Sequence, residues 1–82
     1  MDQPQVTLYT QAGCVESAQV RTWLQRHGVP FHERNVSADP DAARALAETG
    51  IFATPLLVVG GYKILGFRPA EIEEALRASG VI

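Results

Sequence analysis

The sequence contains a single cysteine, Cys14, and this scarcity excludes several classes of protein. One cysteine cannot form an internal disulfide, so the chain does not belong to the secreted scaffolds held together by disulfides. The two histidines, His27 and His32, do not stand at the spacing of a structural zinc site, and we expect them to be solvated or to lie in the core. The sequence therefore predicts no metal site.

An excess of charge and a long apolar run are also missing. The formal net charge of −2 does not provide the basic surface of a nucleic-acid-binding protein. No apolar run approaches the roughly 20 residues that span a bilayer. Residues 1–10 open with acidic and polar residues and continue into a strand-like run, so they do not resemble a signal peptide. With 46% hydrophobic residues, the composition is typical of a small cytoplasmic protein with one domain, residues 1–82.

The hydrophobic pattern predicts the element order β-α-β-α-β-β-α. Runs rich in β-forming residues predict strands at 5–10, 29–37, 56–59 and 62–65, the last two joined by the hairpin loop Gly60–Gly61. Helical spacing predicts three helices that begin at Cys14 or Val15, near Pro40 and near Pro69, and that are ended by Gly28, Gly50 and Gly80. A right-handed crossover and a hairpin then give an α/β fold with a mixed four-stranded sheet flanked by three helices.

The same pattern predicts which side chains recur on the inner faces. Asp39 is expected to cap the second helix. The expected inner residues are Val20, Leu24 and His27 in the first helix, Phe31 and Val36 in the second strand, Ala43, Leu46 and Ala47 in the second helix, and Ile72, Ala75 and Leu76 in the third helix.

Cys14 follows a strand and begins a helix, and this is where open α/β sheets place their ligands. The unpaired N–H groups and the dipole of a helix N-terminus favour a thiolate and lower the pKa of a cysteine from about 8.5. Glu16 is expected to oppose this effect, so we predict a modest shift. The alternative interpretation is a free cysteine that serves as a small core hydrophobe.

Ser17 stands where a second cysteine would complete a C-x-x-C pair. That second cysteine normally resolves a mixed disulfide from within the protein, which a serine hydroxyl cannot do. The sequence therefore predicts a monothiol mechanism that depends on an outside thiol. Ser17 either donates a hydrogen bond to the Cys14 thiolate or is an exposed residue at the helix start, and it is either natural or a replacement of a cysteine.

Several motifs, taken in order, resemble the glutaredoxin branch of the thioredoxin fold. They are a strand that ends in Tyr9-Thr10, a C-x-x-S at Cys14 to Ser17, Thr54-Pro55 before a strand, and a glycine-containing turn before the last helix. The segment "GFRPAEIEEAL", residues 66–76, is similar to the glutaredoxin-like NrdH-redoxins that feed ribonucleotide reductase. The resemblance covers residues 6–76 and implies the thioredoxin fold and a redox activity in electron transport and cell redox homeostasis.

The resemblance also implies the composition of the site. Cys14 would be the nucleophile, and Thr54-Pro55 a cis peptide whose backbone pairs with a thiol substrate. The implied thiol-binding residues are Gln11, Val15, Thr54, Pro55, Gly66, Phe67 and Arg68, with Arg21 and Arg68 as candidate partners for a carboxylate. The chain departs from the family where Ile64-Leu65 replace the Trp-Ser pair usual in NrdH-redoxins and where Gln11 replaces the lysine of many glutathione-using glutaredoxins.

The first hypothesis is a monomeric thiol–disulfide oxidoreductase that reduces mixed disulfides between proteins and a small thiol such as glutathione. It has no tightly bound cofactor, and a thioredoxin reductase-type reductant is a further candidate partner. Three alternatives stay open: a dimer that bridges a [2Fe–2S] cluster through Cys14 and an external thiol, an electron donor of the NrdH type if Ser17 replaces a natural cysteine, and a redox-inactive adaptor.

Overall fold

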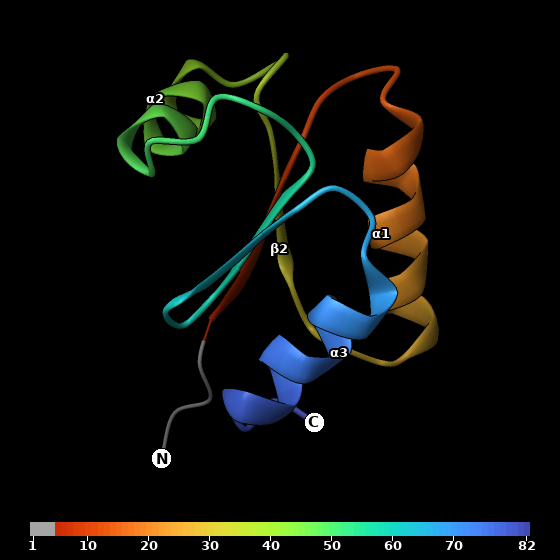
Figure 1. Ribbon diagram of the computed structural model, residues 1–82. Helices are drawn as coiled ribbons and strands as arrows, with labels where there is room; N and C mark the ends of the chain where they lie inside the picture. Colours follow the sequence, from red (N-terminus) through yellow and green to blue (C-terminus); the bar gives the residue numbers. More distant parts are fainter. Residues whose placement is uncertain (1–4) are drawn as a thin grey trace.

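The computed structural model describes residues 5–82, and in this part of the chain the predicted element order is confirmed (Figure 1). The elements are β1 (Val6–Thr10), α1 (Val15–Arg26), β2 (His32–Asn35), α2 (Pro40–Glu48), β3 (Leu56–Val59), β4 (Tyr62–Leu65) and α3 (Pro69–Ala78). The expectation about a signal peptide concerns residues 1–10, of which residues 1–4 lie outside the described residues. No helix within residues 5–82 is long and apolar enough to cross a membrane.

The sheet has the strand order β2-β1-β3-β4, with β1 near its centre. β1 pairs in parallel with β2. The two strands run in the same direction because α1, which connects them, returns the chain to the end of the sheet where β1 begins. β3 pairs antiparallel with both β1 and β4. The Gly60–Gly61 loop joins β3 to β4 as predicted, and Gly60 has a φ of 56°, in the region that favours glycine.

The strands divide the core between two faces of the sheet. Leu8, Leu57 and Ile64 are register partners and belong to the larger cluster, which also contains buried residues of α1 and α3. Tyr9 and Leu56 point the other way and form a smaller cluster with Leu46 of α2. Figure 1 shows the corresponding arrangement, with α1 and α3 on one side of the sheet and α2 on the other. Alternate residues of a strand face opposite sides, so one short strand supports both clusters.

The buried stripe of α2 differs from the prediction. Asp39 caps the helix as expected, with Oδ1 accepting a hydrogen bond from the Asp41 amide at 2.9 Å. However, the buried residues are Ala42 and Leu46, and Ala43 is exposed. Four of the nine residues of this helix are alanines, so the sequence offers little contrast between adjacent stripes, and the prediction of Ala43 was wrong by one residue.

The second strand is also shorter than predicted. β2 covers four residues rather than 29–37 and pairs with β1 alone, and Phe31 and Val36, expected inside it, flank it as half-buried side chains. His27 lies just beyond α1, is exposed and stacks on Trp23 with ring centroids 3.7 Å apart. Val29 rather than His27 enters the core after the helix ends.

An ion pair joins α1 to β2. The Arg21 guanidinium donates through Nε and Nη2 to the two carboxylate oxygens of Glu33, each at 2.6 Å, and Thr10 Oγ1 donates to Glu33 at 2.9 Å. The hydrogen bonds from Arg21 hold the pKa of Glu33 below its usual value, and the Thr10 hydroxyl adds to this, while partial burial works against it. Arg21, expected as a candidate partner for a substrate carboxylate, therefore binds a carboxylate of its own chain.

We expect Glu33→Gln to reduce the decrease in unfolding free energy that the parent protein shows as the pH falls into the acid range. The pKa of Glu33 is lower in the folded than in the unfolded state, so the stabilisation is present above the unfolded value of about 4.3 and is lost as the pH falls through the folded value. Solvent screens this partly exposed pair, so the variant should lose at most about 1 kcal/mol of unfolding free energy at neutral pH.

Urea denaturation at a series of pH values measures this effect. Glu73→Gln is the matched control, because Glu73 pairs with Arg77 on the exposed face of α3, 3.1 Å away. An acid dependence in the Glu33→Gln protein as steep as that of the parent would contradict the assignment.

Candidate active site around Cys14

Cys14 occupies the N-cap position of α1, directly after the turn that leaves β1. Its amide donates to the Gln11 carbonyl at 3.2 Å, and Gly13 turns the chain with a φ of 76°, a conformation that favours glycine. The side chain is half-buried, and it makes no capping hydrogen bond as a neutral group. The sulfur therefore lies at the end of a helix where amide N–H groups lack partners within the helix.

Several donors around the sulfur lower the pKa of Cys14. The Ser17 hydroxyl has the largest influence, and the Ser17 amide follows; partial burial opposes them, and the Thr54 hydroxyl and the Glu16 amide add smaller contributions. The predicted direction of the shift is confirmed. We expected Glu16 to oppose the lowering of the Cys14 pKa, but its amide contributes to it. The Glu16 carboxylate accepts a hydrogen bond from the Phe67 amide at 2.9 Å.

Ser17 lies inside the protein, with 1% of its surface exposed. The interpretation as an exposed residue at the helix start is therefore wrong. Its Oγ has no hydrogen-bond partner among the described residues. A buried hydroxyl without a partner costs free energy, and donation to the nearby thiolate offsets this cost.

Thr54 and Pro55 bring a second loop to the same place. The peptide bond between them is cis, as the resemblance implied. Thr54 Oγ1 donates to Gln11 Oε1 at 3.3 Å, which ties this loop to the turn before Cys14. Pro55 is buried, and its carbonyl accepts a hydrogen bond from the Gly66 amide at 2.9 Å. Gln11, Cys14 and Thr54 thus lie together at one end of the sheet.

The loop between β4 and α3 approaches α1 through Glu16. Gly66 has a φ of 84°, and a Cβ at this position would lie 3.0 Å from Glu16 Oε2, so a side chain here would disturb the contact between Glu16 and Phe67. Unlike Gly66 and Phe67, Arg68 makes no hydrogen bond with Pro55 or Glu16. It pairs with Glu71 at 3.3 Å, is well exposed and does not line the hollow around Cys14. Of the expected site residues, Gln11 and Val15 line the hollow with Cys14, and Thr54 adjoins it through its hydrogen bond to Gln11. Gly66 and Phe67 contact Pro55 and Glu16 instead, and Arg68 pairs with Glu71.

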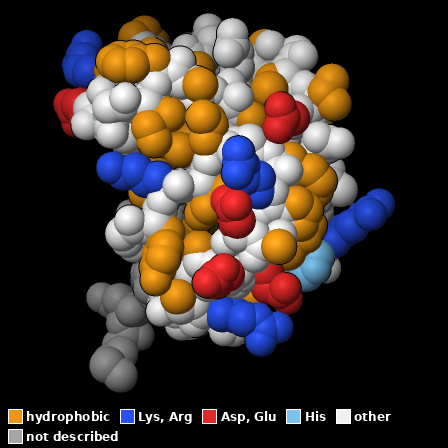
Figure 2. All heavy atoms as spheres, in the orientation of Figure 1, with side chains coloured by type: hydrophobic (Ala, Val, Ile, Leu, Met, Phe, Trp, Pro, Cys, Tyr) orange, Lys and Arg blue, Asp and Glu red, His pale blue; other side chains and the backbone are white. Residues whose placement is uncertain are grey.

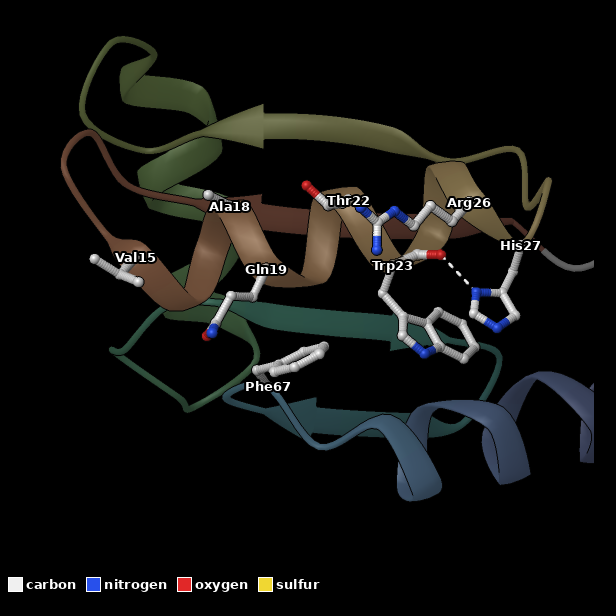
Figure 3. Close-up of a pocket in the computed structure, with 8 residues that line it drawn as sticks. All are labelled: Val15, Ala18, Gln19, Thr22, Trp23, Arg26, His27 and Phe67. Carbon is white, nitrogen blue, oxygen red and sulfur yellow. Dashed lines mark hydrogen bonds between the residues drawn. The ribbon is translucent and has the colours of Figure 1, made fainter.

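Two hollows adjoin at Val15 and Ala18. One, of about 360 Å³, contains Cys14 and is also lined by Gln11, Arg21 and Asn35. The other is a groove of about 400 Å³ along the outer face of α1, where Phe67 faces Trp23 (Figure 3). Sequence reasoning missed Asn35 and this groove. The exposed helical repeat of Val15, Gln19 and Thr22 was the available signal.

Within residues 5–82, no group of three or more His, Cys, Asp or Glu side chains is placed to hold a metal ion.

We expect Ser17→Ala to raise the pKa of Cys14 towards the ordinary thiol value of about 8.5, because it removes the strongest donor to the thiolate. The pH dependence of the alkylation rate measures this pKa. Ser79→Ala, at the end of α3, is the control and should leave the midpoint unchanged. An unchanged midpoint in the Ser17→Ala protein would contradict the role of the hydroxyl.

The stability of the same variant provides an independent check. Because the pKa of Cys14 is lower in the folded state, the thiolate stabilises the fold above the unfolded thiol pKa, and this contribution disappears as the pH falls through the folded value. Below that value, Ser17→Ala removes a buried hydroxyl without a partner and should not destabilise the protein. Above it, the variant should be less stable than the parent.

Comparisons with known proteins agree with this geometry. The glutaredoxin family model matches residues 6–64. The glutaredoxin-like protein NrdH of Lactococcus lactis subsp. cremoris is 31% identical over 67 residues, which cover 82% of this chain and 93% of that protein. The crystal structure of the thioredoxin-like protein BC3987 has a TM-score of 0.80 at 27% identity and covers 88% of this chain and all of that one.

The NrdH-redoxin from Escherichia coli, whose structure was described together with a thioredoxin-like activity profile, is similar as well. Its TM-score is 0.76 at 31% identity, over 85% of this chain and 92% of that one. A family model that covers most of the chain, a relative above 30% identity and a shared fold lead to the same assignment. The chain belongs to the glutaredoxin family of thiol–disulfide oxidoreductases.

Proposed function

We propose that this protein reduces mixed disulfides between proteins and a small thiol, with Cys14 as the nucleophile and no internal resolving thiol. The observation that carries the proposal is the pair Cys14 and Ser17: an accessible sulfur whose pKa is lowered, and a buried hydroxyl one helical turn away. Thiolate is the attacking species in disulfide exchange, so the lowered pKa supports reactivity near neutral pH. A hydroxyl at position 17 cannot form a disulfide.

The proposed cycle has two exchange steps. The Cys14 thiolate attacks the small-thiol sulfur of a mixed disulfide, forms a disulfide with that thiol and releases the protein substrate as its thiolate. A second small-thiol molecule then attacks the adduct, regenerates the Cys14 thiolate and leaves as the disulfide of two small thiols. The two electrons that reduce the substrate come from the small thiols, glutathione or an equivalent, and no bound cofactor is needed.

The residues around Cys14 suit the binding of a disulfide. Thr54 and Gln11 carry the hydrogen-bonding groups next to the sulfur, and we propose that the backbone at Thr54 pairs with the bound half of the substrate. Val15, Gly66 and Phe67 are proposed to border the bound thiol. Arg21 pairs with Glu33 and Arg68 pairs with Glu71, so neither arginine is proposed to bind a carboxylate of the small thiol. The setting is a monomer in the reducing cytoplasm.

Ser17→Cys tests the monothiol mechanism. Positions 14 and 17 are one turn apart at the start of α1, so a cysteine at 17 should form an internal disulfide with Cys14. The variant should lose two thiols on mild oxidation and should reduce the disulfides of insulin without a small thiol. The unmodified protein should reduce at most one equivalent of a glutathione mixed disulfide on its own and should turn over repeatedly only when free glutathione is present.

Cys14→Ser is the negative control for both activities, since it removes the only sulfur that can exchange. Efficient reduction of insulin by the unmodified protein with no small thiol present would refute the monothiol mechanism. Failure of the Ser17→Cys protein to lose two thiols would show that the geometry at the start of α1 is different.

A further inference from the structure

The groove along α1 begins at Val15 and Phe67, which are proposed to border the bound thiol, and extends beyond them to residues that have no part in the proposed exchange. It measures about 400 Å³, and most of its lining is apolar or uncharged. Trp23 and Phe67 provide its aromatic walls, both partly buried against the main core. Figure 3 shows their rings on either side of the hollow, with Val15 at one end and His27 at the other, and with the Arg26 side chain extending from the His27 end back towards Thr22.

The groove is continuous with the reactive cysteine. Val15 and Ala18 line both the groove and the hollow that contains Cys14. Val15 directly follows Cys14 in the chain and is 73% exposed. A polypeptide whose cysteine is the leaving group of the mixed disulfide attacked by Cys14 can therefore pass over Val15 and continue along the helix.

The far end of the groove carries an uncompensated positive charge. Each of the other five arginines in residues 5–82 has a carboxylate within 4.0 Å, whereas no carboxylate of this part of the chain reaches Arg26. No aspartate or glutamate lines the groove. The nearest acidic group at its mouth, Glu16, is held by the Phe67 amide. On the α1 side of the molecule, Figure 2 shows a histidine between apolar and acidic side chains, with a cation that projects beside it.

The length of the groove sets the spacing of a matching segment. α1 rises about 1.5 Å per residue, so Val15 and Arg26 lie roughly 17 Å apart along the helix axis. An extended chain covers this distance with about five residues, at roughly 3.3 Å each.

We propose that the groove binds the segment that flanks the reactive cysteine of a partner protein: an extended, apolar stretch with a carboxylate about five residues from that cysteine. The inference rests on the proposed function, since the partner's cysteine must reach Cys14. The apolar lining accommodates the uncharged side chains, and Arg26 pairs with the carboxylate. The groove thus selects among protein substrates, while Cys14 performs the exchange.

Synthetic peptides test the proposal. Each contains one cysteine, blocked as a glutathione mixed disulfide, and an apolar flank on either its N-terminal or its C-terminal side. The flank ends in glutamate five residues from the cysteine, in lysine five residues away, or in glutamate two residues away. The first type should be reduced with a kcat/KM about two- to fivefold higher than the other two in at least one chain direction, the factor that a solvent-exposed ion pair supplies.

Charge variants show whether Arg26 is the cause. Arg26→Gln should remove the difference between the glutamate and lysine peptides, and Arg26→Glu should reverse it. Arg44→Gln is the matched control, because Arg44 is an exposed arginine on α2, which covers the other face of the sheet. The Arg44→Gln protein should keep the preference of the parent.

The outcomes separate the two proposals. A glutathione mixed disulfide of a single cysteine has no flank, so its reduction reports only the exchange at Cys14. If it is reduced while all peptides react alike, the groove does not select substrates and the inference is overturned. If it is not reduced, the proposed function fails. Size-exclusion chromatography tests one more occupant. A concentration-dependent dimer that Arg26→Glu converts to monomers would show that a second copy covers the groove, and this would also overturn the inference.

Discussion

The site depends on the position of one sulfur atom at the first turn of a helix. Cys14 is the N-cap residue of α1, where the amides of Glu16 and Ser17 have no partners within the helix and favour a negative charge. This position exists because β1 ends at Thr10 and a short turn with Gly13 redirects the chain. The parallel pairing of β1 with β2 then fixes α1 across one face of the sheet. The chemistry at Cys14 is in this sense a consequence of the first β-α-β unit.

The other loops complete the site because the sheet brings their ends together. β3 pairs with β1, so the segment before β3, with Thr54 and Pro55, is carried to the end of β1 where Cys14 lies. β4 pairs with β3, so Gly66 reaches the Pro55 carbonyl and Phe67 reaches Glu16. The pairing of the strands thus brings Phe67 within hydrogen-bond distance of the Glu16 side chain, 51 positions earlier in the chain.

Much of this arrangement was predictable from the sequence. The hairpin at Gly60–Gly61, the cap at Asp39 and the helix start at Cys14 each have a local physical cause that a short stretch of residues reveals. The cis peptide at Thr54-Pro55 came from family resemblance and not from local chemistry. The inner stripe of α2 was misplaced, because a run of alanines does not distinguish one helix face from the next.

Other features depend on contacts between distant elements, which the sequence does not display. Arg21 is bound by Glu33 because β2 lies beside α1, and Glu16 is bound by Phe67 because the loop before α3 folds against the same helix. The burial of Ser17 and the groove at Trp23 likewise follow from how α1 packs on the sheet and against the last loop. These contacts decide which charges are available to a substrate and which are not.

The most direct test of the account is the intact mass of the reduced protein after incubation with excess oxidised glutathione near neutral pH. The account predicts a shift by one glutathione, located at Cys14, that free glutathione reverses and that the Cys14→Ser protein does not show. An unmodified mass under these conditions would contradict the account, because it would mean that the sulfur at the start of α1 is neither ionised nor accessible enough to exchange.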